Sequence, residues 1–318
     1  MKNILKILIV LLIVNGTQVW GQQLPLTSQY LANPYLLSPA FAGYNENSKV
    51  FFTYRKEWGD MEGSPRTAFI NAYLPVSERV WMGGQIISDQ TDISKIFSAQ
   101  LSYTYHLPIG SSHQLYFSLW GGLFQNSINL EGAIVSDAND PLLIGQSQLT
   151  GTSLNAGSSI IFRWRNGSFG ITAPSLFTSE DAYAVGSGNN LVVIKPQLIT
   201  HLTYNFRLNY NWNLQPFLVY RSIKDSPYHY DISMLAIYRD NYWGALTYRN
   251  NGKFAISLGG NLTTELSLNY TYEFATQSLI SSPAPIHEFM VGFNLSSGKK
   301  FKSNRWIEMQ KSRGYNAY

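Results

Sequence analysis

Strict alternation of polar and apolar side chains over stretches of about ten residues constrains this chain more than any other feature. In residues 265–274, Leu266, Leu268 and Tyr270 fall on one face of a strand, while Ser267 and Asn269 fall on the other. Residues 97–105 and 198–208 repeat the pattern. A tilted strand needs about 9–11 residues to cross a bilayer, whereas soluble strands average about five or six. The alternation therefore predicts the wall of a membrane-spanning β-barrel.

About fourteen such segments follow one another along the chain. They lie near residues 49–57, 66–75, 79–88, 94–107, 113–128, 150–164, 168–175, 191–208, 211–221, 230–239, 241–249, 253–261, 263–274 and 287–295. An even number is expected of a closed antiparallel barrel whose two ends lie on the same side of the membrane. The fold class is therefore predicted to be all-β, a closed antiparallel transmembrane β-barrel.

The connections between these segments differ in length according to parity. Those after even-numbered segments are short, as at 76–78 and 165–167, whereas several after odd-numbered segments are long, as at 58–65, 129–149 and 176–190. Barrels of bacterial outer membranes have short periplasmic turns and longer outer loops. A soluble sandwich has no reason to sort its loops in this way, and no repeat of 40–50 residues indicates a propeller.

Composition agrees with a barrel. Aromatic residues make up 14% of the chain and charged residues only 13%, about half the usual share in soluble domains. A mean hydropathy of -0.11 excludes a bundle of membrane-spanning helices. The chain has no cysteine, which excludes disulfides and thiol chemistry.

The alternation divides the chain into four parts. Residues 1–21 have Lys2 and Lys6 before a short apolar run and are expected to be a cleaved signal peptide. Residues 22–48 form an irregular N-terminal segment, a possible plug, and residues 49–295 form the barrel. Residues 296–318 carry six basic residues against Glu308, which predicts a basic periplasmic tail, or simply a solvated end.

No residue pattern indicates catalysis, a cofactor or a metal. His106 and His113 flank a short turn and are expected to be solvated, and His201 is expected to face the lumen. His229 with Asp231, and His287 with Glu288, are pairs of a kind that barrel proteases use, but such spacings are common by chance. No nucleophile elbow, phosphate loop or zinc motif occurs, and the basic residues do not form a nucleic-acid surface. The chain is expected not to be an enzyme.

One sequence motif precedes the barrel and a second lies at its start. The first comprises SQYLANP at 28–34 and SPAFAG at 38–43. The second comprises YRKEW at 54–58 and GSPRT at 63–67. Together they resemble the PorP/SprF family of type IX secretion and gliding-motility membrane proteins of Bacteroidetes. Ser38 stands where that family usually has Asn, and Glu57 where it usually has Gln; the latter adds a charge near the first outer loop. The family-motif residues, expected to contact a partner or form the plug, are Tyr30, Asn33, Pro34, Pro39, Gly43, Arg55, Trp58, Pro65 and Thr67.

The resemblance implies a non-enzymatic outer-membrane component that supports export or surface attachment of a large cargo such as an adhesin. Its implied partners are membrane lipid, an exported protein with a C-terminal sorting domain, and periplasmic ring or motor components. The alternative is a porin-like passive channel or small-solute transporter, since a barrel of this size has room for a pore.

A physical hypothesis accounts for the first motif. Pro34 and Pro39 lack backbone donors, so residues 28–43 are expected to pack in the lumen or across its periplasmic mouth rather than join the wall. Tyr30 and Asn33 would then bond to wall residues such as Arg55, and Gly43 would allow a tight turn into the first strand. A loose leader is the other possibility.

Overall fold

The computed structural model describes residues 27–45, 47–58, 63–110, 112–130, 148–178, 195–224, 226–275 and 285–295. The predicted signal peptide, the basic tail and most of the two longest connections lie outside these ranges. No helix in the described ranges is long and apolar enough to cross a membrane.

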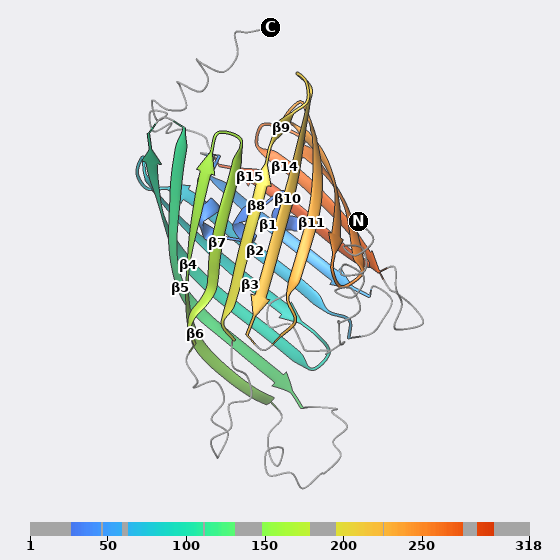
Figure 1. The fold of residues 1–318 in the computed structure, drawn as a ribbon. Helices are drawn as coiled ribbons and strands as arrows, with labels where there is room; N and C mark the ends of the chain where they lie inside the picture. Colours follow the sequence, from blue (N-terminus) through green and yellow to red (C-terminus); the bar gives the residue numbers. More distant parts are fainter. Residues whose placement is uncertain are drawn as a thin grey trace, which may run out of the picture.

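The described chain is a closed antiparallel barrel of fourteen wall strands, which confirms the predicted fold class. The strands are β1 (Lys49–Glu57), β2 (Arg66–Pro75), β3 (Val80–Gln90), β4 (Ser94–Ile109), β5 (His113–Asn129), β6 (Gln148–Trp164), β7 (Gly167–Thr178), β8 (Gln197–Tyr204), β9 (Phe206–Arg207), β10 (Trp212–Ile223), β11 (His229–Tyr238), β12 (Tyr242–Arg249), β13 (Lys253–Asn261), β14 (Leu266–Ala275) and β15 (Ile286–Asn294). β8 and β9 are two pieces of one wall strand and both pair with β10; every other strand pairs with its neighbours along the chain, and β1 with β15 closes the wall (Figure 1).

The segment predicted as one strand over 191–208 is instead two pieces, β8 and β9, which both pair with β10. The break lies at Asn205, whose backbone N–H donates to the carbonyl of Asn166 rather than to the wall. Pro216 on β10 lies beside the break and has no N–H to donate. A proline inside a neighbouring strand therefore interrupts an otherwise regular ladder.

Alternation along each strand sorts side chains to the two faces of the wall. On β12, Leu246 is 65% exposed on the outer face, while Ala245, Thr247 and Arg249 are buried on the inner face. The outer face carries large apolar side chains, which lipid solvates in a membrane barrel. The inner face carries most of the buried polar groups, so the core of this protein lies inside the barrel.

Residues 27–45, hereafter the lumen segment, occupy that interior. They contain three short 3-10 turns, η1 (Gln29–Leu31), η2 (Pro34–Leu36) and η3 (Pro39–Phe41). Figure 1 shows this blue segment enclosed by the wall. Its side chains join two hydrophobic clusters with inward residues of the wall, one around Tyr30 and Phe41 and one around Tyr35.

Candidate functional site: the lumen segment and its charged anchor

The lumen segment satisfies part of its backbone hydrogen bonding by itself. Pro34 and Pro39 each begin a 3-10 turn, where a missing N–H costs nothing. Their carbonyls accept the N–H groups of Leu37 and Ala42, both at 2.9 Å. The two prolines thus favour compact turns over a further wall strand.

Hydrogen bonds tie the lumen segment to strands spaced around the whole wall. Asn33 donates to Asn71 Oδ1 on β2 at 2.8 Å, and Thr104 Oγ1 on β4 donates to the carbonyl of Pro39 at 3.0 Å. Across the barrel, the Tyr30 hydroxyl donates to Asp231 Oδ2 on β11 at 3.1 Å. Because the wall is closed, a segment that contacts opposite strands lies across the lumen.

The segment runs from the long-loop end of the barrel to the short-turn end. Ser28 lies beside Glu288, the third residue of β15, which follows the long connection after β14. The carbonyl of Ala42 lies 2.9 Å from His106 Nε2, close to the short turn between β4 and β5. The segment therefore occupies much of the lumen's depth.

Six ionisable side chains on the inner wall form what we term the charged anchor: Arg55, Arg221, Arg249, Asp231, Glu273 and Glu288. Arg55 Nε lies 2.9 Å from Glu288 Oε1, Arg221 Nη1 3.0 Å from Asp231 Oδ2, and Arg249 Nη1 2.6 Å from Glu273 Oε2. All six side chains are at most 5% exposed. Burying such charges is costly unless they are paired and further hydrogen-bonded.

The lumen segment supplies those further hydrogen bonds. Glu288 Oε2 accepts from Thr27 Oγ1 at 2.8 Å and from the Ser28 backbone N–H at 3.0 Å. Arg249 Nη2 donates to Ser28 Oγ at 2.8 Å. Hydrogen bonds to a charged group are about twice as strong as neutral ones. The charged anchor therefore holds the start of the lumen segment.

Aromatic side chains pack the rest of the segment. The Tyr30 ring lies 5.6 Å from that of Phe217, and the Phe41 ring 4.9 Å from that of His201. Farther along, Arg163 stacks on the Tyr44 ring at 4.3 Å and donates to the Tyr44 carbonyl at 2.8 Å. Such ring contacts stabilise the docked segment beyond the contribution of the apolar area that each ring buries.

Gly43, near the end of the lumen segment, forms a turn that only glycine accommodates. Its φ is +71°, and a Cβ there would overlap the ring of Trp81. Glycine populates positive φ without steric cost. The turn thus lets Trp81 of β3 pack against the backbone that leads into β1.

Burial changes the acidity of Tyr30 and Tyr35, two of the three tyrosines in the lumen segment. Desolvation raises the pKa of Tyr35 to about 12, although its hydrogen bond with Ser102, at 2.8 Å, opposes the shift. Desolvation and the negative charge of Asp231 raise the pKa of Tyr30 above its ordinary value. Both hydroxyls are therefore neutral at physiological pH and available as donors.

The motif residues separate into two groups. Tyr30, Asn33, Pro34, Pro39 and Gly43 lie in the lumen segment; Arg55 faces it through Glu288 but does not bond to Tyr30 or Asn33, whose partners are Asp231 and Asn71.

The second group lies at or near the first long connection. Trp58 is 40% exposed at the end of β1 with φ 48°, and the Pro65 carbonyl accepts the Glu57 N–H at 3.0 Å. Thr67 is buried and donates to Asp89 at 2.6 Å. Glu57, the departure noted in the sequence, forms an ion pair with Arg55.

The sequence did not predict which wall residues bind the lumen segment, although alternation placed Glu273 on the polar face of its strand. His106 was expected to be solvated and is not; its ring lies between Trp81 and Tyr116. His201 faces the lumen as expected. His287 contacts the Tyr270 hydroxyl at 2.8 Å, whereas its neighbour Glu288 faces inward. The two therefore do not form a catalytic pair.

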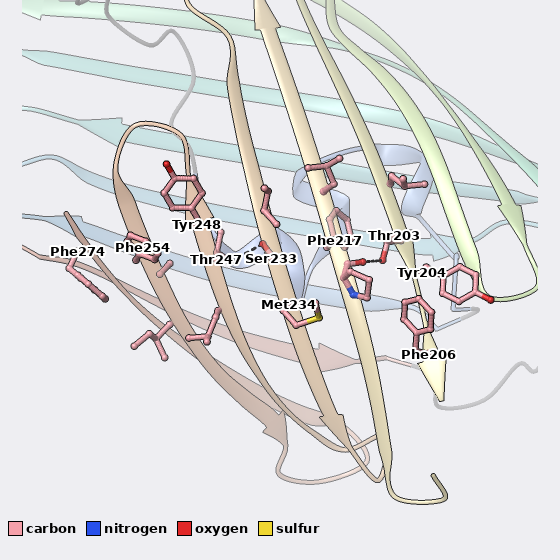
Figure 2. Close-up of a pocket in the computed structure, with 17 residues that line it drawn as sticks. Thr203, Tyr204, Phe206, Phe217, Ser233, Met234, Thr247, Tyr248, Phe254 and Phe274 are labelled. Carbon is pink, nitrogen blue, oxygen red and sulfur yellow. Dashed lines mark hydrogen bonds between the residues drawn. The ribbon is translucent and has the colours of Figure 1, made fainter. Parts of the chain in front are cut away.

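A hollow of about 500 Å³ lies on the outer, apolar face of β8 to β14 (Figure 2). Phe206, Met234 and Phe254 line it, and Thr203 behind them donates to the Pro216 carbonyl at 3.0 Å. It belongs to the lipid-facing surface and contains none of the motif residues.

Solved structures with a similar fold are outer-membrane barrels. A monoaromatic hydrocarbon channel, CymD, matches with a TM-score of 0.52 and 10% identity over 86% of this chain and 94% of its own. The toluene transporter TbuX of Ralstonia pickettii gives 0.52 and 10% over 81% and 92%. At such identities the likeness concerns the fold alone. No curated protein matches the sequence.

The family comparison is more specific. The profile of "Type IX secretion system membrane protein PorP/SprF" matches residues 19–293, which include the lumen segment, all of the wall but Asn294, and all nine motif residues. This confirms the resemblance seen in the two motifs. The chain belongs to the PorP/SprF family of type IX secretion system membrane proteins.

Proposed function

We propose that this protein is a sealed, non-enzymatic scaffold of the type IX apparatus in the outer membrane, where it supports export or surface attachment of a large protein such as an adhesin. The observation that carries the proposal is the lumen segment, bonded to strands on opposite sides of the wall. A barrel whose interior is filled by its own chain is suited to present loops rather than to pass solutes.

The proposed non-enzymatic role fits the state of the carboxylates in the lumen. The carboxylates of the charged anchor are all bound to arginines. No group of three metal-ligating side chains occurs in the part of the chain that the structure describes. A general base needs a free position beside a reacting group, and these carboxylates are occupied.

The proposed location and partners rest on the two faces of the wall, on its connections and on the sequence of the two ends of the chain. The apolar outer face fits membrane lipid, and the long connections fit contacts with an exported protein that has a C-terminal sorting domain. The predicted tail at 296–318 would meet periplasmic ring or motor components, and a signal peptide at 1–21 would direct export.

Two measurements on the full chain test the proposal. Purified protein in planar bilayers should give little steady conductance, and cells lacking the protein should lose surface retention of a sorting-domain protein until the gene is restored. Large, steady pores together with normal retention would support the porin-like alternative instead.

A further inference from the structure

Basic side chains cluster on the outer face of the wall near its long-loop end. Lys56 is the next-to-last residue of β1, and Arg66 is the first residue of β2. The two lie directly opposite each other in the ladder, and His287 of β15 lies opposite Lys56 on its other side. We call Lys56, Arg66 and His287 the basic rim.

Alternation turns this row away from the lumen. Lys56 follows Arg55, which is buried inside the barrel, so Lys56 lies on the outer face. Arg66 is exposed, and the row continues from it to Gln90 of β3 and then to Lys95 of β4, which are exposed as well. Three cationic side chains therefore share one outward row that runs from β1 to β4.

These charges have no counterion among the described residues. None of the three cationic side chains forms one of the ion pairs of the described chain. Glu57, next to Lys56 in sequence, pairs with the inward Arg55, and Asp92, exposed in the turn after β3, belongs to none of those pairs. Like charges directly opposite each other on adjacent strands destabilise a sheet. The pairing of Lys56 with Arg66 is therefore unfavourable unless an anion binds between them.

The depth of the basic rim is that of lipid headgroups. In the next outward row toward the short turns, Tyr54 lies opposite Ala68, and in the row after that Phe52 lies opposite Ile70. Phe52 and Ile70 are 45% and 47% exposed, so this part of the face is apolar. Two residues along a strand advance by about 7 Å. The basic rim thus lies where the apolar band ends, which is where a lipid-facing charge is tolerated best.

The long-loop end of β10 to β13 has a different outer face. Tyr220 lies opposite Tyr230, and Tyr248 lies opposite Phe254. Lys253, beside Phe254, is paired with a carboxylate of the charged anchor. Aromatic girdles without free charge are the ordinary interface of a barrel. The uncompensated charge on β1 and β2 is therefore a local feature that selects an anionic group.

We propose that the basic rim binds the phosphate of a phosphorylated lipid in the outer leaflet. The ammonium of Lys56 and the guanidinium of Arg66 donate to the phosphate oxygens, which charge assistance makes strong. The acyl chains of the same lipid lie on the apolar rows of Tyr54 and Phe52, and this continuity with an apolar face favours a lipid over a soluble anion. The inference rests on the proposed location in the outer membrane and adds a headgroup contact to it.

Lipid binding by the purified full chain in detergent micelles tests the proposal. The probes are diphosphorylated lipid A, an uncharged galactolipid and inorganic phosphate, and native mass spectrometry measures the bound fraction. Lys56→Gln with Arg66→Gln is the test variant. Arg79→Gln with Arg165→Gln, at exposed positions in two short turns, is the control with the same change of charge.

The natural chain should bind lipid A and not the galactolipid. A basic residue at an anionic lipid surface contributes about fivefold to binding, so the test variant should bind lipid A about 30-fold more weakly. The control variant should bind it as the natural chain does. The charge-preserving exchange Lys56→Arg with Arg66→Lys should also bind it. If the double variant fails to fold, Arg66→Gln alone takes its place, with a loss of about fivefold.

An equal loss in the control variant, equal binding of the galactolipid, or displacement of lipid A by inorganic phosphate at the same phosphate concentration overturns the proposal. So does binding that appears only after Asp60→Asn and Glu62→Gln, because carboxylates of the adjoining connection would then be the partners of the basic rim. The proposed function is tested separately. Lost surface retention on deletion of the chain, together with undiminished lipid A binding by the test variant, refutes the basic rim alone. Recovery of the chain outside the outer-membrane fraction refutes the location itself.

Discussion

Replacing Glu288 with Gln should release the start of the lumen segment. The carboxylate accepts hydrogen bonds from Thr27 and Ser28 and pairs with Arg55, and it is fully buried. Glutamine has nearly the same shape but no charge, so both hydrogen bonds weaken and Arg55 keeps only Glu57 as an ionic partner. The substitution therefore tests the anchor without creating a cavity.

The expected size of the effect follows from those contacts. A hydrogen bond to a charged group contributes about 1.5–3 kcal/mol, and glutamine retains one acceptor oxygen. We expect docking of the segment to weaken by about 2–4 kcal/mol, which raises the released population roughly 30- to 700-fold. The wall itself should stay closed, because its ladder does not involve this side chain.

Protease trimming and bilayer conductance measure that population. Glu288→Gln should expose residues 27–45 to protease and should give open events more often than the natural protein does. Glu265→Gln, at an exposed carboxylate in a short turn, is the matched control and should change neither. If Glu288→Gln stays as protected and as closed as the control, the charged anchor does not hold the segment.

Three further outcomes are expected. Gly43→Ala should lower the barrel's melting temperature more than Gly110→Ala, since both glycines have positive φ but only a Cβ at 43 meets Trp81; equal losses would refute the packing argument. The neutral hydroxyl of buried Tyr35 should contribute its full stabilisation of the folded state below pH 10, and this stabilisation should be lost as the pH rises toward the raised pKa of about 12. In an ultraviolet titration, Tyr35→Phe should have one late-ionising tyrosine fewer than the natural protein, and an unchanged curve would contradict this. Trp58→Gly should relieve about 1 kcal/mol of strain at its positive φ; reduced surface retention with undiminished stability would indicate a partner contact, whereas unchanged retention would argue against one.

The wall could be predicted because each strand's sequence determines which faces its residues occupy. The predicted segments 49–57, 66–75 and 253–261 coincide with β1, β2 and β13. One failure had its cause on another strand: β8 breaks at Asn205 beside Pro216, and no local pattern around Asn205 indicates this. The start of β14 was misplaced because Thr263 Oγ1 accepts the N–H groups of Glu265 and Leu266 and extends the turn.

The site was predictable only on one side. The motif identified Tyr30 and Asn33, but their partners depend on the depth at which the segment crosses the lumen. Ser28 and Glu288 are 260 residues apart in sequence. Alternation predicts which face of the wall a residue occupies but not its depth along the barrel axis, so it could not bring these two together. His106 illustrates the same limit, since its position beside a short turn indicated solvent while the carbonyl of Ala42 occupies that space.

The division of charge between wall and segment explains how the segment is held. Residues 27–45 contain no Lys, Arg, Asp or Glu, so every ion pair of the charged anchor joins two wall residues. With three arginines and three carboxylates, the anchor is balanced before the segment docks, and the segment completes it through hydroxyls and one backbone N–H. Raising the salt concentration from 0.1 M to 1 M shortens the screening length from about 10 Å to about 3 Å, which weakens exposed charge pairs far more than buried contacts. Docking by uncharged donors should therefore persist across the salt concentrations a bacterial surface meets, as a permanent seal requires.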